Sequence, residues 1–391
     1  MTSTAAGTRP KYRWTILAAG VVAQAAFSAI LLGLPSIAPA IQHHYRLSLT
    51  QVGVVLAAVN FGAIATLLTW GLVADRVGER AVIAIGQCGA AGALLWAGTA
   101  QSFAVLVGAL ALAGAVGAGV NAASGRAVMS WFSVDERGLA LGIRQMAVPL
   151  GGAIAAGALP ALETHLGLGA AFAGLAAGCF VAAIVGAMFI RAEPAAEHPD
   201  LSKPLRDARV WRICMASTFY VTTQIALIGF LVLFLHDRRG VSTAVAAGAL
   251  ALTQILGGGA RIAAGRWSDR TRTRIVPLRL VALALALTVG AATVLLDASL
   301  WIVVPALVVA GTFALSWNGL SFTATAEAAG PARSGAAIGL QQTFLAGGSI
   351  VAPIAFGAVV HHASWRTAFA LAALSPLIGY AALSPLDERR P

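Results

Sequence analysis

Long apolar runs separated by short polar connections set the pattern of the whole chain. Each run has roughly 20 residues, which is enough for a helix to cross about 30 Å of hydrocarbon. The pattern therefore predicts twelve transmembrane helices, with boundaries good to several residues. The predicted spans are 14–36, 52–71, 81–99, 104–130, 139–161, 170–190, 212–235, 243–265, 280–296, 301–325, 338–360 and 367–385.

One longer polar stretch interrupts this pattern. Residues 191–211 are rich in charged residues and proline, and they separate the first six predicted spans from the last six. Such a composition is typical of a linker. We therefore expect a six-helix bundle over 1–190, a cytoplasmic linker over 191–211 and a second six-helix bundle over 212–391.

The two halves repeat each other in sequence. Gly71-Leu-Val-Ala-Asp75-Arg76 recurs as Gly265-Arg-Trp-Ser-Asp269-Arg270, each time after an apolar run. A duplicated, largely apolar chain is how many secondary transporters are built. We predict an all-α membrane protein of two pseudo-symmetric bundles. Further residues recur at a single offset of 197: Gly114, Asn121, Gly138, Gly142 and Gln145 return as Gly311, Asn318, Gly335, Gly339 and Gln342.

Composition supports a membrane protein and excludes other classes. Hydrophobic residues make up 59% of the chain and charged residues 10%, whereas soluble proteins carry about 25% charged residues. The three cysteines all lie in apolar runs and lack the spacing of metal ligands. No acid pair, activated nucleophile or His/Cys cluster is evident. We therefore expect no cofactor, no metal site and no enzymatic activity.

The distribution of the net charge of +11 indicates how the chain is oriented across the membrane. With a cytoplasmic N-terminus, 19 of the 26 Lys and Arg residues fall in predicted cytoplasmic segments, with Arg212 at the first residue of its span counted among them, and three fall further inside spans. This positive-inside bias places both termini in the cytoplasm, and we expect a bacterial inner (plasma) membrane. A nucleic-acid partner is not needed to explain the charge. The external segments hold only Arg46, Arg238, Arg239 and Arg366.

The duplicated loop motif carries a family resemblance. Gly71-x-x-x-Asp75-Arg76-x-Gly78-x-Arg80 resembles the loop motif of the major facilitator superfamily, and the resemblance covers the whole chain. The second copy lacks the glycine after the arginine, as is usual in the C-terminal half. A plain role as positive-inside anchors would explain the arginines but not the repeated aspartate. The resemblance implies a gating role for Gly71, Asp75, Arg76, Arg80, Gly265, Asp269 and Arg270.

Polar residues are unevenly distributed among the spans. Spans 3, 6, 9 and 12 carry few of them, and the other eight carry most. Polar groups in hydrocarbon are costly unless protein or water satisfies them, so these eight spans are expected to surround a wet cavity, as the resemblance also implies. Each polar residue could contact substrate or simply join helices, which is the commoner use of buried amides. The candidates are Gln24, Asn121, Gln145, Tyr220, Gln254, Asn318 and Gln342.

Three arginines lie within spans, and no acid lies in the middle of any span. An ionisable residue inside the membrane is a functional-site hypothesis by default, and a guanidinium fork suits a carboxylate. We therefore predict a secondary transporter that moves a small organic anion, with proton symport or anion exchange as its coupling. We expect it to act as a monomer in the bilayer.

Arg261 is the first candidate for the substrate carboxylate. The spacing Arg261-x-x-x-Gly265-x-x-x-Asp269 resembles the eighth helix of monocarboxylate transporters and oxalate/formate exchangers, which implies that Arg261 holds a carboxylate. The alternative is that Arg261 snorkels to the cytoplasmic headgroups.

Arg126 and Arg144 are candidates for a second positive site. Arg126 lies five residues before Trp131, in a stretch that resembles the fourth-helix end of the anion:cation symporter family. Its alternatives are snorkelling or pairing at a gate. Arg144 lies one turn into the fifth span, next to the duplicated Gln145. An interfacial anchor is the alternative for Arg144.

Two rival functions use the same fold. A drug or metabolite exporter that works by proton antiport would carry an early arginine in the fourth helix, yet residues 106–119 contain none. The fifth helix reads Val148-Pro149-Leu-Gly151-Gly152, one residue short of the exporter signature. A non-transporting sensor is the second rival. The organic-anion hypothesis is therefore preferred.

Overall fold

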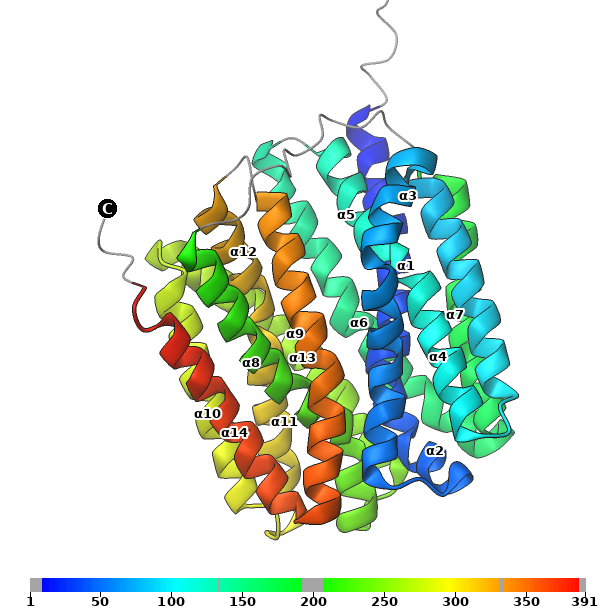
Figure 1. Cartoon of the computed structure of the whole chain (residues 1–391), viewed down its shortest axis with the longest axis vertical. Coiled ribbons are helices and arrows are strands. Elements are labelled where there is room, and N and C mark those ends of the chain that lie inside the picture. The colour runs from blue at the N-terminus through cyan, green and yellow to red at the C-terminus, as the bar shows by residue number, and fades with distance from the viewer. Residues whose placement is uncertain (1–8, 133, 192–206, 331–333, 387–391) are drawn as a thin grey trace, which may run out of the picture. The chain divides into compact units, whose positions relative to one another are not determined.

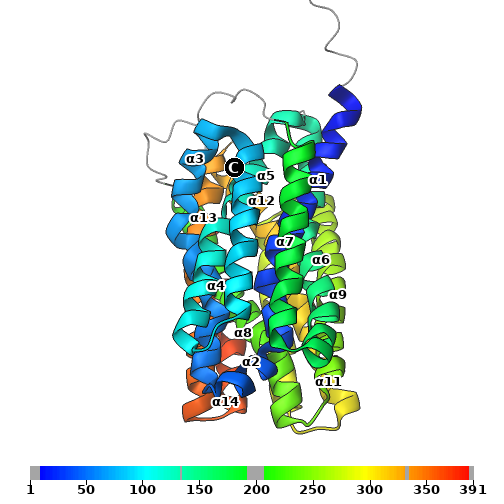
Figure 2. The same ribbon diagram turned by 90° about the vertical axis from the view of Figure 1, so that its right-hand side faces the viewer.

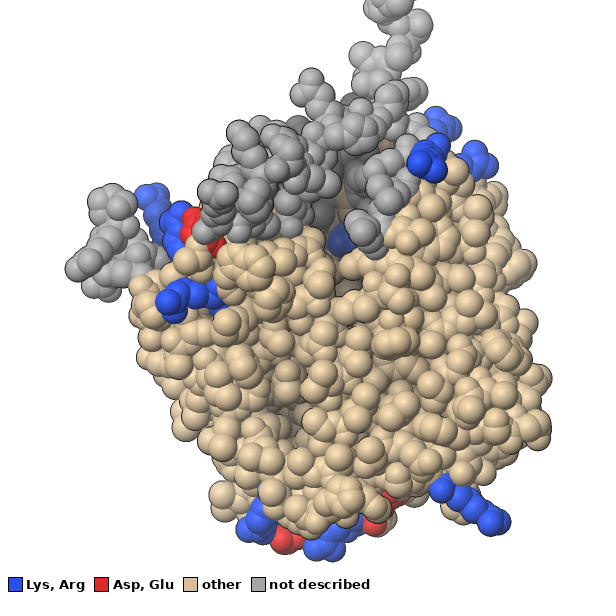
Figure 3. Space-filling model, viewed as in Figure 1, with Lys and Arg blue, Asp and Glu red and all other residues tan. Residues whose placement is uncertain are grey.

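The computed structural model describes residues 9–132, 134–191, 207–330 and 334–386. All regular elements within these ranges are helices. Twelve of the helical segments are long and apolar enough to cross a membrane, which confirms the predicted all-α fold. On the face shown in Figure 3, charged side chains gather near the helix ends, and the lengths between them are uncharged.

The first compact unit comprises Met1–Gly33 and Ala58–Glu197. Its helix α1 packs against α5, α6 and α7, and α6 also packs against α7 (Figures 1 and 2). Its elements are α1 (Arg9–Gly33), most of α3 (Leu49–Gly98), α4 (Phe103–Gly117), α5 (Gly119–Trp131), α6 (Val134–Leu166) and α7 (Leu168–Phe189).

The second compact unit comprises Leu34–Ala57 and His198–Pro391. Its helix α8 packs against α9, α11, α12, α13 and α14. The sequence assigned all of residues 1–190 to the first bundle, whereas Leu34–Ala57 groups with the second unit by its contacts. The predicted division of the chain at 190 and 212 stays a prediction. The elements are η1 (Leu34–Ile37), α2 (Ala38–Tyr45), the start of α3, α8 (Ala208–Leu233), η2 (Phe234–Arg238), α9 (Thr243–Thr271), α10 (Ile275–Val294), α11 (Leu300–Ser316), α12 (Asn318–Ala329), α13 (Ser334–His362) and α14 (Trp365–Leu383).

Helix α3 contains two spans, Leu49–Leu67 and Arg76–Gly98. Near the start of the second span, Gly78 has φ 78° and ψ 165°, a conformation that residues with a Cβ rarely adopt. Gly78, the glycine that follows the arginine in the first copy of the loop motif, therefore interrupts the helical backbone where the second span begins.

Two other spans are interrupted at matching places in the two units. Helix α4 ends at Gly117 and α5 begins at Gly119, whereas α11 ends at Ser316 and α12 begins at Asn318. Each pair forms one candidate span. An interruption frees backbone carbonyl groups that a continuous helix would satisfy, so it creates acceptors inside the membrane. Both interruptions lie within three residues of the duplicated Asn121 and Asn318.

The duplicated Gly114 and Gly311 permit close helix packing in the two units. A Cβ added at Gly114 would overlap the carbonyl oxygen of Val59 on α3, and one added at Gly311 would overlap the side chain of Thr253 on α9. Small residues at helix contacts let backbones approach within a membrane. Gly114 therefore lets the fourth span pack closely against the second, and its repeat Gly311 lets the tenth span pack closely against the eighth.

Candidate functional site

A polar cluster joins three helices of the first unit. Gln24 on α1 is 3% exposed, and its Nε2 donates to Oδ1 of Asn121 on α5 at 3.0 Å. Arg144 on α6 donates from Nη2 to Gln24 Oε1 at 3.2 Å and to the Asn121 carbonyl at 2.9 Å. Its Nε donates to Ser124 Oγ at 2.9 Å. The sequence predicted three of these four residues, and the structure brings them together.

The depth of the Arg144 guanidinium follows from its contact with Gln24. Hydropathy alone would put Arg144 at the membrane surface, since the candidate span of α6 begins at Ile143. Gln24, however, comes 12 residues after Tyr12, where the first candidate span begins, which is about 18 Å along a helix. Hydrocarbon is about 30 Å thick. The contact geometry is the firmer guide, and it favours a buried charge over an interfacial anchor.

All hydrogen-bond partners of Arg144 within the described part of the chain are neutral. They are an amide oxygen, a backbone carbonyl and a hydroxyl. Such acceptors reduce the cost of a charge in the membrane without neutralising it. The Nη1 nitrogen makes no hydrogen bond to the described residues.

The second unit contains the corresponding cluster. Asn318 Nδ2 donates to Gln224 Oε1 at 3.1 Å, as Gln24 and Asn121 pair in the first unit. Ser321 lies 197 residues after Ser124, and Gln341 lies 197 residues after Arg144. The Nε2 of Gln341 donates to Ser321 Oγ, as Arg144 does to Ser124. The two units therefore share the contact to the equivalent serine, made by a charge in the first and by an amide in the second, whereas Gln341 makes no hydrogen bond to Gln224 or Asn318.

Ser217 on α8 completes this second cluster. It contacts Ser321 through their hydroxyl oxygens, and Gln341 Nε2 donates to its Oγ at 3.0 Å. All three side chains are at most 1% exposed. These hydrogen bonds join α8, α12 and α13, whereas the buried Oε1 of Gln341 has no hydrogen-bond partner among the described residues.

Arg261 lies at the interrupted span of the second unit. Its side chain is buried at 8% exposure, and its Nε donates to the carbonyl of Leu315 at 3.2 Å. Asn318 Nδ2 lies 3.4 Å from the same carbonyl. Arg261 thus satisfies an acceptor near the end of α11 and lies beside the Gln224–Asn318 pair. Burial and this contact disfavour snorkelling.

Other predicted residues take different positions. Tyr220 is 1% exposed and packs edge-on against Trp317, with ring centroids 5.7 Å apart, inside a hydrophobic core. Gln254 is fully buried, and neither of its amide atoms has a hydrogen-bond partner among the described residues. Gln145 and Gln342 are half-buried. The side chain of Arg126 lies outside the described residues.

The residues of the two predicted gating motifs differ in their exposure. Gly71 and the side chain of Asp75 lie outside the described residues, whereas Arg76 and Arg80 are exposed. Glu79, within the same motif, is buried at 3% exposure. Gly265 is half-buried and Arg270 is exposed.

Asp269 of the second motif belongs to an ion-pair network. Arg274 approaches Asp269 at 2.6 Å and Glu327 at 3.0 Å, and so links the end of α9 to α12. Burial lowers the pKa of Arg274, but its hydrogen bonds to Glu327 and Asp269 outweigh burial and raise that pKa above its ordinary value. Arg274 was not among the residues predicted from the sequence.

Comparisons with known proteins agree with this architecture. The family model described as Major Facilitator Superfamily matches residues 15–353. An MFS-type transporter of Mycobacterium tuberculosis is 32% identical over 372 residues, which cover 93% of this chain and 83% of the relative. A bacterial homologue of the human lysosomal transporter Spinster, inward-facing and occupied, has a TM-score of 0.79 at 16% identity over 97% of both chains. The nucleoside transporter NupG, as a mutant, has a TM-score of 0.75 at 14% identity over 96% of this chain and 99% of that one.

Twelve spans, duplicated halves and polar clusters inside the membrane define an integral membrane transporter for small molecules. The chain belongs to the major facilitator superfamily, which confirms the resemblance inferred from the duplicated loop motif. Its members are transporters and not enzymes.

Proposed function

We propose that the chain is a secondary transporter of a small organic anion with a carboxylate group, working by alternating access. The observation that carries this proposal is the Arg144 guanidinium, held deep in the first unit by neutral acceptors alone among the described residues. A positive charge maintained there without an acid is suited to a ligand that brings the negative charge.

The chemistry of the cluster favours a carboxylate. A guanidinium is planar, stays charged and binds carboxylates through two parallel N–H donors. Nε and Nη2 of Arg144 bond to Ser124, Gln24 and Asn121, so we propose that Nη1 donates to a substrate carboxylate and that the full two-donor contact forms only if Nη2 exchanges a protein partner for the ligand. The amides of Gln24 and Asn121 adjoin the same guanidinium and offer further hydrogen bonds to the polar part of a substrate.

Arg261 is proposed as a second positive group, in the second unit. Its place beside the Gln224–Asn318 pair, at the interrupted tenth span, supports a role in ligand binding. The resemblance to carriers of monocarboxylates and of oxalate and formate points the same way. For coupling we propose proton symport, with the substrate as the proton carrier, or anion exchange, because neither needs a carboxylate of the protein inside the membrane.

A second candidate function is export of a drug or a neutral metabolite. The observation that favours it is the neutral amide and hydroxyl cluster of Gln341, Ser217 and Ser321 in the second unit. Amides can hydrogen-bond an uncharged polar molecule, and NupG is named as a nucleoside transporter. Its Gln341 Oε1 has no partner among the described residues, but the cluster carries no charge, and both serine hydroxyls and the amide Nε2 already bond one another, which makes it the weaker candidate for a ligand site.

Ligand-dependent thermal stability tests the choice, because a ligand that binds only the folded state raises the melting temperature. The purified protein would be screened with mono- and dicarboxylates, inorganic anions, nucleosides and lipophilic cations. We expect stabilisation by one class of carboxylate that is lost in Arg144→Gln and reduced in Arg261→Gln. Arg209→Gln, at an arginine whose side chain is 64% exposed, is the matched control and should retain it. Stabilisation by cations or neutral compounds alone would support the exporter instead.

A further inference from the structure

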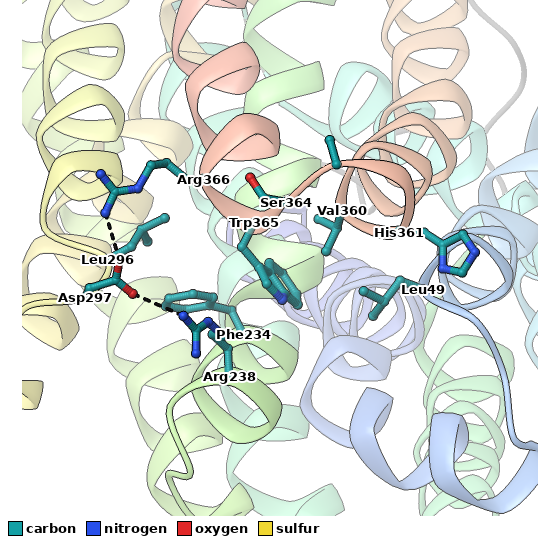
Figure 4. Close-up of a pocket in the computed structure, with 11 residues that line it drawn as sticks. Leu49, Phe234, Arg238, Leu296, Asp297, Val360, His361, Ser364, Trp365 and Arg366 are labelled. Atoms are coloured by element: carbon teal, nitrogen blue, oxygen red, sulfur yellow. Dashed lines mark hydrogen bonds and ion pairs between the residues drawn. The ribbon is translucent and has the colours of Figure 1, made fainter.

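A cavity of about 580 Å³ lies at one end of the second unit. Its walls come from η2, the α10–α11 connection, the α13–α14 connection and the start of α3 (Figure 4). It is far from the Asp269–Arg274 network, because α9 begins just after η2 and runs its full length before reaching Asp269. Its volume is in the range of small-molecule pockets, about 300–1,000 Å³.

Two arginines in the wall share one carboxylate. Asp297 approaches Arg238 at 3.5 Å through Oδ1 and Arg366 at 2.8 Å through Oδ2. Asp297 is the one acid among the described residues that line the cavity. The wall therefore carries an excess of positive charge, from Arg238 and Arg366. The N-terminus of α14, which starts at Trp365, contributes a further partial positive charge.

The ion pairs are open to exchange. The three side chains are 57–59% exposed, and ion pairs in contact with water contribute little net stability. A carboxylate from solution would meet the same two guanidinium groups that now hold Asp297. The spacing of the arginines is thus already matched to a carboxylate.

Apolar side chains form the adjoining wall. Phe234 is 1% exposed and meets Trp365 edge-on, with ring centroids 5.3 Å apart, and buried Leu296 also lines the space. Figure 4 shows the Trp365 ring beside the Arg238–Asp297–Arg366 group. The half-buried Trp365 ring, backed by Phe234 and next to guanidinium groups, fits a molecule with a flat apolar body and an acidic end.

We propose that this cavity is a second binding site, separate from the Arg144 cluster, for a soluble carboxylate with an aromatic body. Asp297 acts as a built-in competitor that occupies the two arginines when the site is empty. Binding here requires no translocation and does not depend on the proposed transport function.

The test uses indole-3-acetate and its neutral analogue indole-3-acetamide as probes, with calorimetry on the full chain in phosphatidylcholine nanodiscs. Wild type should bind the acid and bind the amide much more weakly. Asp297→Asn removes the competitor and should tighten binding of the acid by up to about fivefold, the upper end expected for one exposed ion pair. Arg366→Gln and Arg238→Gln should each weaken it, with melting temperatures close to wild type.

Two further measurements distinguish binding in this cavity from binding at the Arg144 cluster and from binding of a lipid headgroup. Arg209→Gln, the exposed control, should leave binding of indole-3-acetate unchanged, and the binding that Arg366→Gln removes should persist in Arg144→Gln, so failure of the transport proposal would not affect this result. Loss of binding in Arg144→Gln but not in Arg366→Gln would place the ligand at the first cluster and overturn the proposal. Weaker binding in Asp297→Asn would also overturn it. Competition by phosphatidylglycerol in the nanodiscs would assign the cavity to a lipid headgroup and overturn the soluble ligand.

Discussion

Arg144 and Gln341 occupy equivalent positions in the two halves of the chain, and each donates to the equivalent serine of a neighbouring helix, Ser124 or Ser321. The duplication supplied this donor-to-serine contact twice. It carries a charge in the first unit and an amide in the second. This difference is the basis of the proposed anion selectivity and of the first prediction.

Arg144→Gln should fold as stably as the wild type while losing affinity for an anionic substrate. The second unit makes the same contact to serine with a glutamine, so the amide can satisfy Ser124 without a buried charge. A hydrogen bond to a charged group contributes about 1.5–3 kcal/mol, so affinity for the anion should fall at least about tenfold. Melting temperature and substrate binding would be measured on the same preparation. A large drop in melting temperature would mean that Arg144 is mainly structural.

Gln341→Ala should destabilise the protein, because it removes the donor that joins Ser217 and Ser321. Truncating a buried hydrogen-bonding group costs about 1–3 kcal/mol. The neighbouring Gln342→Ala is the matched control, since Gln342 is only half-buried. Thermal unfolding of both variants in detergent checks the prediction. Equal melting temperatures would contradict the account of the second cluster.

Gly114→Ala should disrupt the contact between the fourth and second spans. The added methyl group would overlap the Val59 carbonyl, and backbone cannot move aside as a flexible side chain can. Gly108→Ala on the same helix is the control, because a Cβ there meets nothing within 4 Å. We expect lower folded yield and melting temperature for Gly114→Ala only. Similar behaviour of both variants would refute the close approach.

Arg274→Gln should weaken the link between α9 and α12 by a small, salt-dependent amount. The Asp269 and Glu327 side chains are 69% and 55% exposed, and exposed ion pairs contribute at most about 1 kcal/mol each. The loss should shrink at high salt, where screening removes the interaction from the wild type as well. Melting curves at low and high salt test this. An unchanged difference would show that the network is not electrostatic in origin.

Much of the fold could be predicted from the sequence, because hydrocarbon thickness dictates span length and duplication dictates symmetry. The pairing of Gln24 with Asn121 could not, since a span's hydropathy does not say which polar residues of different helices meet. Gln224, Ser124 and Gln341 were missed as site residues for this reason. The 197-residue offset that links Ser124 to Ser321 was nevertheless present in the sequence as a signal.

The depth of the Arg144 side chain in the membrane also could not be predicted from the sequence. Counting along the fifth span puts Arg144 near its start, and only the contact with Gln24 shows how far its side chain reaches. The role of Arg274 was hidden for the opposite reason, because it stands among several arginines in one loop. Only the folded chain distinguishes the arginine that faces Asp269 and Glu327.

Uptake of radiolabelled carboxylates into proteoliposomes, with and without a proton gradient or internal anion, tests the central claim most directly. The account predicts saturable uptake of a carboxylate by the wild type and by Arg209→Gln, and little uptake by Arg144→Gln. Carboxylate uptake by Arg144→Gln with unchanged apparent affinity, or uptake of neutral or cationic compounds alone by the wild type, would contradict it.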